Sequence, residues 1–508
     1  MPFTMFDEQN HLKDQDNDYV INFYHTKKFD DDHTIITVDH GSWVVLNQEE
    51  LDLLRFDRLN ENPHLKNLLE EKGIILTQKN KSYIINSTKN KYQHTQRGTS
   101  LHIIAPTLRC NHKCIYCHAK SVSPHSTEHD MSKDTAKKVV DFIFQSPSSS
   151  LTIEFQGGEP LLNFEIIKFV HDYSKEKGRE TNKQLRFVIV TNFTAFSQDK
   201  KKFIMDNNID LCTSLDGPKE VHDHNRLFFG SKKSAYDSVI KTIEEFRKEG
   251  KGMGALPTIT KKSLDYPKEI VHEYILQGFD SIMSRNLNCM GFAKQLWDKL
   301  GYTAEEYIDF FTKQTDYMIE LNKKGFKFMD VKLRFVLQRM LSTNPRTFTC
   351  FGSPCGAVVG QIAYDHDGNI FTCDEARSDD TFIIGNVQKD TYQGVIEKSG
   401  RKVVDHTSCM SLNCDNCVWH PYCGTCMVWA KGGQGNAVSK LAEDYECKIR
   451  GSQTEYLFKK LIYDKETRKI LNHWAFPNRY PFPYKEIKLN SKEEREEFVQ
   501  KLREEKNG

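Results

Sequence analysis

Three cysteines within eight residues constrain this 508-residue chain more than any other feature. Cys110, Cys114 and Cys117 have the spacing Cys-x3-Cys-x2-Cys and directly follow the apolar run LHIIAPTL. Three such thiolates can hold three irons of a [4Fe–4S] cube, whose usual ligand set is four cysteines. The fourth iron then keeps an open position, as a catalytic zinc does. A zinc knuckle is the alternative, because short Cys-x2-Cys pairs alone favour zinc.

Whether the remaining cysteines form disulfides or bind metal depends on the cellular compartment of the protein. The start, MPFTMFDEQN, lacks the basic segment and apolar stretch of a signal peptide, and no apolar run approaches the roughly 18 residues of a membrane span. We therefore expect a cytoplasmic protein, in which clustered cysteines among the 14 bind metal instead of forming disulfides. Cys212 and Cys289 stand apart and are expected to be buried small hydrophobic residues. With 71 Lys and Arg against 70 Asp and Glu, the charge favours neither nucleic acid nor a membrane as partner.

Strand-like apolar runs alternate with amphipathic helical stretches from residue 101 onward. The runs are LHIIAPTL, LTIEF, LRFVIVTNF, DLCTSLDG, GMGALPTIT and FDSIMSRN. Strands that alternate with helices form right-handed βαβ units around a parallel sheet. Six such units predict an α/β fold, a partial (β/α)6 TIM-like barrel, with active residues at the C-terminal ends of its strands.

The N-terminal segment, residues 1–95, has a different pattern. Short strand-like runs precede a helix that starts at Asn47, where Glu50 three residues on gives a capping-box signature. A second helix is expected to end at Gly73. The order of these elements predicts a winged-helix-like module, followed by a charged, amide-rich linker at 86–98. A DNA-binding wing is the alternative, which the lack of a strong basic stripe disfavours.

Four further regions complete the predicted division of the chain. Residues 96–300 hold the barrel, and residues 301–349 form a helical connector. The region 350–450 is rich in cysteines and has little periodicity, so we expect bound metal instead of a packed core to hold it together. The tail, 451–508, is charged and partly helical.

The motif around the cysteine triad resembles that of radical S-adenosylmethionine enzymes. That family carries Cys-x3-Cys-x-aromatic-Cys at the end of the first barrel strand, and Tyr116 supplies the aromatic residue. The resemblance continues with GGEP after the second strand, VTN at the end of the third, and SLDGP followed by HDHNR. It implies that the triad binds a [4Fe–4S] cluster together with S-adenosylmethionine, whose cleavage gives a 5′-deoxyadenosyl radical.

The same resemblance places particular residues around the cofactor. The GGEP segment would meet the amino group of the methionine moiety, and Ser214 and Arg226 would contact the ribose or the methionine carboxylate. The full set that it implies is Tyr116, Gly157, Gly158, Glu159, Asn192, Ser214 and Arg226.

The C-terminal cysteines resemble the SPASM extension of radical enzymes that act on peptides and proteins. That extension binds two auxiliary [4Fe–4S] clusters. Carried over by order, the first would be held by Cys350, Cys355, Cys373 and Cys426, and the second by Cys414, Cys417, Cys423 and Cys447. The last pair here is Cys-x2-Cys where the usual pattern has Cys-x3-Cys, and Cys409 is an additional candidate ligand. The alternative is a zinc ribbon of Cys414, Cys417, Cys423 and Cys426.

Asp374 directly follows Cys373 and is the candidate catalytic residue. A carboxylate there suits a general base that takes the proton released when a substrate is oxidised. The resemblance supports this role, because the equivalent residue of sulfatase-maturing enzymes performs it. The alternative is that Asp374 and Glu375 form a solvated acidic pair.

A closer resemblance, from about residue 15 to 450, is to the radical maturases of His-Xaa-Ser systems. TSLHIIAPTLRCNHKCIYC, SPSSSLTIEFQGGEPLLNFEIIKF, SIMSRNLNCMGFA and DEAR carry it. Several members of that group lack cysteines near the positions of Cys355 and Cys373, which this chain has. The resemblance implies an enzyme that oxidatively modifies, by crosslinking, a ribosomally made precursor peptide or protein. Partner maturase proteins and a flavodoxin- or ferredoxin-type electron donor would assist it.

The N-terminal module has a role in this hypothesis. By the same resemblance it would bind the leader of the precursor, which adds as a strand to the edge of the module's sheet. Two alternatives stay open at this point. One is a radical enzyme on another target, such as a sulfatase-type protein or a small molecule. The other is a non-enzymatic zinc-binding interaction protein.

Overall fold

The computed structural model describes residues 18–344, 350, 352–408, 414 and 416–505. These residues form two compact units. The first unit holds the described parts of 1–93, 338–346 and 413–423, and the second holds those of 94–337, 347–412 and 424–508. Among the described residues, no helix combines the length and the apolar character that a membrane crossing requires. The finer five-part division of the chain stays a prediction.

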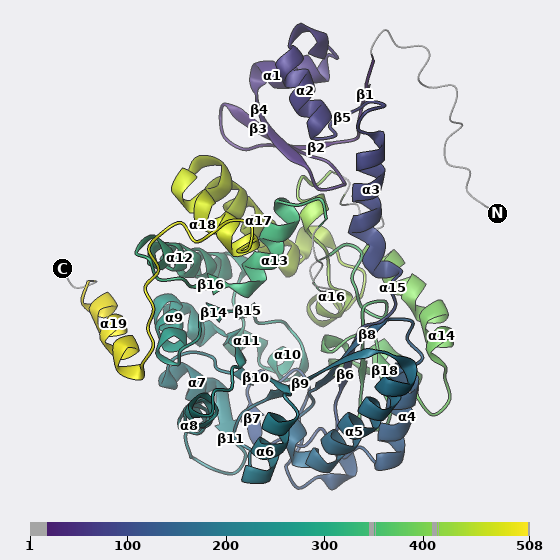
Figure 1. Cartoon of the computed structure of the whole chain (residues 1–508), viewed down its shortest axis with the longest axis vertical. Coiled ribbons are helices and arrows are strands. Elements are labelled where there is room, and N and C mark those ends of the chain that lie inside the picture. The colour runs from purple at the N-terminus through teal and green to yellow at the C-terminus, as the bar shows by residue number, and fades with distance from the viewer. Residues whose placement is uncertain (1–17, 345–349, 351, 409–413, 415, 506–508) are drawn as a thin grey trace. The chain divides into compact units, whose positions relative to one another are not determined.

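The first unit is built on a three-stranded antiparallel sheet with the order β2-β3-β4 (Figure 1). Its strands are β2 (His25–Lys28), β3 (His33–Thr37) and β4 (Trp43–Asn47), and a short antiparallel pair joins β1 (Val20–Ile21) to β5 (Ile75–Leu76). Its helices are α1 (Gln48–Arg55), α2 (Pro63–Glu71) and α3 (Lys81–Tyr92). Ile36 and Leu46 of the sheet pack with Leu51, Leu54 and Leu69 of the helices in one apolar core.

The predicted start of the first helix and the predicted end of the second are confirmed in this unit. The Asn47 side chain accepts the Glu50 N–H at 2.9 Å, and the Glu50 carboxylate accepts the Asn47 N–H at 3.0 Å. Gly73, beyond the end of α2, has a φ of +67°, the left-handed conformation that commonly terminates helices. The predicted linker at 86–98 contains the boundary between the two units, but it is helical over much of its length, because α3 continues to Tyr92. No glycine or proline interrupts this polar segment before residue 98.

The second unit contains an eight-stranded sheet with the order β12-β10-β9-β8-β6-β17-β18-β19. Five of its strands are parallel and come from the predicted barrel: β6 (Leu101–Ile104), β8 (Ser150–Phe155), β9 (Gln184–Thr191), β10 (Asp210–Ser214) and β12 (Gly254–Leu256). The helices that alternate with them include α4 (Lys133–Ile143), α5 (Phe164–Thr181), α6 (Gln198–Asp206), α7 (Lys219–Asn225), α8 (Ala235–Lys248) and α9 (Pro267–Leu276). Figure 1 shows α4, α5 and α6 beside these strands. The predicted α/β alternation is confirmed.

Shorter strands extend and brace the barrel. β13 (Thr258–Ile259) pairs in parallel with β15 (Arg285–Asn286), β14 (Ser281–Ile282) pairs in parallel with β16 (Met329–Asp330), and β7 (His112–Cys114) pairs antiparallel with β11 (Arg226–Phe228). The predicted run GMGALPTIT splits into β12 and β13 because Pro257, between them, has no N–H to donate to a ladder.

Helices make up most of the chain after the barrel strands. They are α10 (Gly291–Gln295), α11 (Trp297–Leu300), α12 (Ala304–Lys323), α13 (Val331–Met340), α14 (Tyr392–Val395), α15 (Arg401–Thr407), α16 (Met427–Gln434), α17 (Tyr445–Tyr463), α18 (Lys465–Ala475) and α19 (Lys492–Glu504). The helical character predicted for the connector and for the tail is confirmed.

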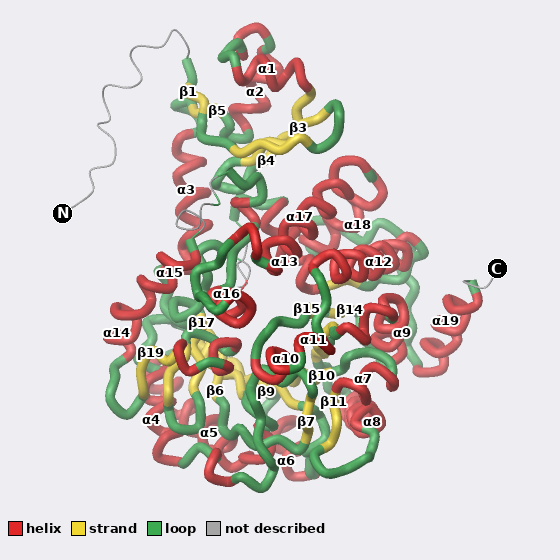
Figure 2. Tube along the Cα trace, turned by 180° about the vertical axis from the view of Figure 1, so that it is seen from behind, coloured by secondary structure: helices red, strands yellow, loops and turns green. Residues whose placement is uncertain are grey.

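The cysteine-rich region contributes strands that the sequence did not predict. β17 (Gln361–Tyr364) lies parallel to β6, and β18 (Asn369–Phe371) and β19 (Ile383–Asn386) follow antiparallel. Figure 2 shows β6, β17 and β19 as yellow strand segments in the same region. Ile103 of β6 shares a buried apolar core with Ala363, Phe371, Val403 and Val428. The expectation that this region lacks a packed core is therefore wrong. Strands of three or four residues are too short to show a period.

Candidate active site

The predicted radical triad lies in the loop that follows β6. Cys110 is buried, Cys114 ends β7, and the Cys117 N–H donates to the Cys114 carbonyl at 3.2 Å. The pairing of β7 with β11 sets Arg226 directly opposite Cys114. Three cysteines that are close in sequence are thus also held close in space.

The burial of these thiols shows what the triad is suited to bind. Burial raises the pKa of Cys110 well above its usual value, and the neighbouring Cys114 raises it further, as Cys117 does to a lesser extent. Burial also raises the pKa of Cys114 to about 12, although the charge of Arg226 opposes this rise. Thiols that suppress each other's ionisation become thiolates together only when a metal replaces their protons. The triad therefore fits a cationic iron cluster.

Polar N–H groups point at two of the three sulfurs. Sγ of Cys110 accepts the His112 N–H at 3.3 Å and lies 3.8 Å from Nδ2 of Asn192. Sγ of Cys114 lies 3.8 Å from Nη1 of Arg226. Hydrogen bonds to cysteine sulfurs tune the reduction potential of an iron–sulfur cluster. Asn192 and Arg226, both predicted from the resemblance, are therefore placed against the triad.

Asp216 is one buried residue of the site that sequence reasoning missed. It is fully buried, and its carboxylate accepts the Tyr116 hydroxyl at 2.7 Å, Nε of Arg226 at 3.1 Å and Nδ2 of Asn225 at 3.1 Å. Burial acts to raise the pKa of Asp216, but the charges of Arg226 and His222 outweigh it and hold the pKa below its usual value. The guanidinium of Arg226 also lies 5.2 Å from the ring centre of Tyr116. Asp216 stands within the motif SLDGP, so its position at a strand end was a usable signal.

The GGEP segment packs against the backbone that leads into the triad. The Gly158 N–H donates to the Thr107 carbonyl at 3.0 Å, and the Glu159 N–H donates to the Arg109 carbonyl at 2.7 Å. Gly157 has a φ of +127°, and a Cβ atom at Gly158 would collide with backbone carbonyl oxygens of the facing loop. The two glycines thus permit an approach that no larger residue allows.

Glu159 ties this segment to the neighbouring strand. Its fully buried carboxylate accepts the Leu161 N–H at 3.1 Å, the Thr191 hydroxyl at 2.7 Å and the Asn192 N–H at 2.9 Å. Burial raises the pKa of Glu159 against the lowering effect of these hydrogen bonds. Ser214 is half-buried at the end of β10. Contacts of the predicted set with S-adenosylmethionine stay predictions.

The first predicted auxiliary set is brought together in the second unit. Burial raises the pKa of Cys373 well above its usual value, and the nearby sulfurs of Cys426, Cys355 and Cys350 add to the rise. Each sulfur also has an N–H partner. Gln361 Nε2 donates to Cys350 at 3.4 Å and the Ala357 N–H to Cys355 at 3.5 Å, while Cys373 and Cys426 accept from the backbones of Ala376 and Trp429. Cys355 and Cys373 are buried, and Cys350 and Cys426 are half-buried. Four neighbouring thiols with N–H partners fit an iron–sulfur cluster better than four unrelated cysteines.

The second predicted auxiliary set is divided between the units. Cys414, Cys417 and Cys423 belong to the first unit and Cys447 to the second, where its N–H donates to the helix-capping Asp444 at 2.8 Å. The Cys417 N–H donates to the Cys414 carbonyl at 2.8 Å, and Cys423 follows a 3₁₀ turn at His420–Tyr422. The four-cysteine set, and the zinc ribbon that competes with it, stay predictions. Cys409 lies outside the described residues.

Asp374 is held in an ion pair. Its side chain is 14% exposed and accepts Nε of Arg377 at 3.1 Å, and Nε2 of His118 lies 3.5 Å from its other oxygen. Burial acts to raise the pKa of Asp374, but the charges of Arg377 and His118 hold it far below its usual value. A carboxylate with so low a pKa is ionised at every working pH. The role of Asp374 as a general base stays a prediction.

Arg377 and Arg285 pair with Asp374 and Glu375, and these contacts test whether the two carboxylates are solvated. Glu375 is only 12% exposed and forms an ion pair with Arg285 of β15, whose pKa this pair raises. The interpretation of Asp374 and Glu375 as solvated is therefore wrong. Burial likewise raises the pKa of Glu154 in β8, and the charge of Asp374 adds to the rise. No sequence signal linked Glu154 or Arg285 to this region, because their partners lie far along the chain.

The lone cysteines match their predicted character only in part. Cys212 and Cys289 are half-buried. Burial raises the pKa of Cys212 to about 12 and that of Cys289 above its usual value. Both are therefore neutral thiols at physiological pH.

Comparisons with known proteins agree with this site. The family model "Radical SAM superfamily" matches residues 104–273. The cysteine-type anaerobic sulfatase-maturating enzyme of Clostridium novyi (strain NT) is 25% identical over 346 residues, which cover 64% of this chain and 87% of that protein. The radical SAM cyclopropyl synthase TigE of Paramaledivibacter caminithermalis is 22% identical over 431 residues, which cover 78% of this chain and 85% of that protein.

A solved structure supports the fold independently. Native anSMEcpe with bound AdoMet and the Cp18Cys peptide superposes with a TM-score of 0.60 at 21% identity, over 72% of this chain and 98% of that chain. At this identity the likeness establishes the fold. The family match covers the segment that holds the triad, GGEP and Asp216. Residues 104–273 therefore match the radical SAM superfamily, and the chain carries a radical SAM enzyme domain.

Proposed function

We propose that this enzyme is a maturase that oxidises a ribosomally made precursor peptide or protein, forming a crosslink within it. The observation that carries the proposal is the four-cysteine site of Cys350, Cys355, Cys373 and Cys426 in the same unit as the radical triad. When bound, the clusters and S-adenosylmethionine would supply one-electron reduction, a 5′-deoxyadenosyl radical and an acceptor for the electron that an oxidised substrate gives up.

The chain's own residues position this chemistry. Cys110, Cys114 and Cys117 would hold the first cluster, while Asp216 fixes Tyr116 and Arg226 around the triad. A closed barrel interior would keep water away from the radical and so protect it from side reactions. Asp374, directly after Cys373, is the group that would accept the substrate proton.

Relatives support a peptide or protein as the substrate. A cysteine-type anaerobic sulfatase-maturating enzyme acts on a sulfatase, and native anSMEcpe binds both AdoMet and the Cp18Cys peptide. These matches also favour a second candidate function, the maturation of a sulfatase-type protein. A flavodoxin- or ferredoxin-type protein is the proposed electron donor, and partner maturase proteins would act on the same precursor.

The first unit would bind the leader of the precursor by strand addition. The Phe29 N–H donates to the His33 carbonyl at 2.9 Å, and this register makes the N–H groups of Thr26 and Lys28 point away from β3. The Val38 N–H donates to the Ser42 carbonyl at 3.1 Å, which sets the register of β3 with β4. In this register the N–H group of Val45 on β4 points away from β3. A leader segment would pair with one of these two edges.

Proline substitutions test which edge is used. Thr26→Pro removes an outward donor from β2, and Val45→Pro removes one from β4. Because one or two ladder hydrogen bonds are lost, we expect one of the two variants to weaken leader binding about tenfold in Kd, with Thr26→Ala and Val45→Ala as controls. Unchanged binding in both proline variants would contradict the strand-addition proposal.

Mass spectrometry of a co-expressed precursor tests the function itself. The precursor encoded beside the enzyme gene should lose two hydrogens per crosslink in the presence of the wild-type enzyme. It should stay unmodified with Cys114→Ala. If that precursor stays unmodified while a sulfatase-derived cysteine peptide is converted, the second candidate replaces the first. Anaerobic reconstitution should give about 12 iron and 12 sulfide per chain, counting four of each per cube. Zinc without sulfide would exclude both candidates.

A further inference from the structure

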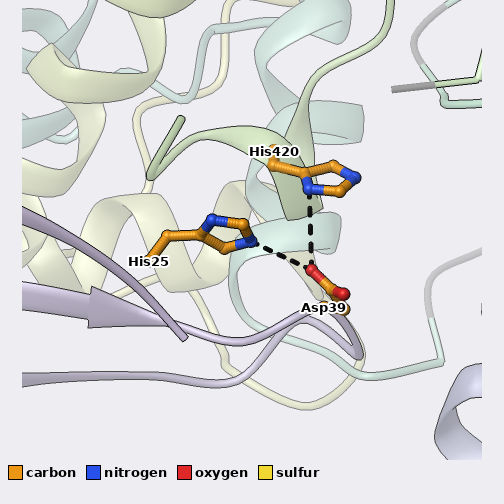
Figure 3. A group of neighbouring side chains, drawn as sticks. All are labelled: His25, Asp39 and His420. Atoms are coloured by element: carbon orange, nitrogen blue, oxygen red, sulfur yellow. Dashed lines mark hydrogen bonds and ion pairs between the residues drawn. The ribbon is translucent and has the colours of Figure 1, made fainter. Parts of the chain in front are cut away.

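Three side chains from distant parts of the sequence converge in the first unit (Figure 3). Nε2 of His25 lies 3.0 Å from Oδ1 of Asp39, and Nδ1 of His420 lies 3.6 Å from the same oxygen. One ligand atom from each residue lies within 4.8 Å of the other two. Both imidazole nitrogens thus face one carboxylate oxygen from different elements.

Contacts around the three residues hold them in this arrangement. His25 begins β2, Asp39 follows β3, and His420 opens a 3₁₀ turn. The Thr37 hydroxyl donates to the Val418 carbonyl at 2.7 Å, and the Tyr422 hydroxyl donates to the Gly41 carbonyl at 3.1 Å. In the sequence these two bonds flank both Asp39 and His420, so they fix the turn against the sheet whether or not an ion is bound.

We propose that His25, Asp39 and His420 bind one divalent transition-metal ion, of which Zn²⁺ is the representative. Two imidazoles and one carboxylate form a ligand set that zinc and similar ions use in proteins. With bond lengths of about 2.0–2.1 Å, two ligands of one tetrahedral ion stand about 3.3–3.4 Å apart. The two observed separations lie on either side of this value.

A hydrogen-bonded His–Asp–His group explains the geometry less well. The His25–Asp39 separation suits a hydrogen bond, but 3.6 Å between His420 and Asp39 is too long for one. His25 and His420 are 3% and 6% exposed, whereas the side chain of Asp39 is 49% exposed. The ion would therefore have two buried ligands and one at the surface, with its remaining positions open to water.

The charges around the site are compatible with a cation. Oδ1 of Asp39 lies 3.0 Å from Nε2 of His25 and 3.6 Å from Nδ1 of His420, so this carboxylate supplies a negative charge to the ligand set. Nζ of Lys91 donates to the backbone carbonyl of Asp39 at 2.5 Å. This neighbouring positive charge would weaken metal affinity without removing a ligand atom.

The ion would hold the turn at His420, which lies between two predicted cluster ligands, Cys417 and Cys423. His420 stands between Cys417 and Cys423, and the His420 N–H donates to the Cys417 carbonyl at 2.9 Å. Metal binding would restrain these cysteines relative to β2 and β3 of the same unit. The proposed ion is thus separate from the iron–sulfur clusters, since its ligands contain no sulfur.

Zinc binding to the full chain, with its clusters reconstituted anaerobically, tests the proposal. The protein is exposed to Zn²⁺ alone, freed of excess metal by gel filtration, and analysed for zinc by mass spectrometry. We expect about one zinc per wild-type chain, held in X-ray absorption by nitrogen and oxygen at about 2.0–2.1 Å, without sulfur at about 2.3 Å. His25→Ala and His420→Ala should lose this zinc.

Two further variants keep the test independent of folding. Asp39→Asn retains a hydrogen-bond partner for His25 and should lower zinc affinity at least about tenfold, because the charged ligand is lost. His33→Ala removes an exposed histidine of the same sheet, which pairs with Asp30, and should retain full zinc content. Zinc content that is unchanged in His25→Ala and Asp39→Asn, or a shell of sulfur around the zinc, would overturn the proposal.

Discussion

The guanidinium of Arg226 donates to both carboxylate oxygens of Asp216, from Nε at 3.1 Å and from Nη2 at 3.3 Å. This buried ion pair is the structural link between the end of β10 and the strand opposite the cysteine triad. Its loss would leave a buried guanidinium without its counter-charge. The Asp216–Arg226 pair therefore stabilises the loop of the cysteine triad, and it neutralises the buried charge of Arg226 beside that loop.

Asp216→Asn should destabilise the cluster-free protein by about 3–5 kcal/mol, the usual effect of removing one partner of a buried ion pair. Because the pKa of Asp216 in the fold lies below its unfolded value of about 3.9, the contribution of the pair is present above about pH 4. It is lost as the pH falls through the folded pKa. Urea unfolding between pH 3 and pH 7 should show the difference between variant and wild type narrowing below about pH 4.

An exposed pair in the same domain is the control for that experiment. Asp237→Asn breaks the pair with Lys219, in which both side chains are more than half exposed. The expected cost is below about 1 kcal/mol. Equal costs for Asp216→Asn and Asp237→Asn would mean that the buried pair contributes no more than a surface one.

Cys114→Ala should abolish the formation of 5′-deoxyadenosine. The variant loses one of three ligands to the first cluster, so the iron content should fall from about 12 to about 8 per chain. Chromatography of the nucleoside products and iron analysis measure the two effects. Cys289→Ala, a lone half-buried cysteine, should change neither. Cleavage that persists in Cys114→Ala would show that the triad has been assigned wrongly.

Gly158→Ala should disrupt the triad loop through sterics alone. The added Cβ would collide with the carbonyl oxygens of Leu108 and Arg109, which are backbone atoms and cannot turn aside. Overpacking of this kind costs about 1–3 kcal/mol. We expect a matching loss in thermal stability and reduced iron in the first cluster. Gly252→Ala, where a Cβ would meet nothing within 4 Å, should behave as wild type, and equal effects in both variants would contradict the argument.

Asp374→Asn should lower product formation about 100-fold or more, the usual contribution of a general base, while 5′-deoxyadenosine is still formed. Because the pKa of Asp374 lies far below its usual value, the wild-type rate should show no loss of this base between pH 5 and pH 8. The surface variant Asp367→Asn serves as control. Product formation unchanged in Asp374→Asn would remove Asp374 from the mechanism.

The parts of the structure that were predictable are those with local causes. The spacing of Cys110, Cys114 and Cys117 and the capping box of Asn47 and Glu50 depend on residues a few positions apart. The barrel strands were equally visible, because each lies in a strand-like run of five or more residues between amphipathic helices.

Non-local pairings could not be predicted in this way. β17 lies beside β6 although about 260 residues separate them. The sequence of neither strand indicates which strand it pairs with. Arg285 meets Glu375, and Thr37 meets Val418, for the same kind of reason. Asp216 was an intermediate case. Its motif was recognised, but only the fold shows that Tyr116 and Arg226 converge on it.

The pairing of β6 with β17 also has a consequence for how the chain is made. The first barrel strand leaves the ribosome long before its neighbour on one side, so its backbone edge stays open until residue 364 has been synthesised. Pairing across so long a loop is slow, and an open strand edge invites association with other chains. The nascent chain therefore passes through a prolonged, aggregation-prone stage, in which chaperone binding would have its greatest effect on yield.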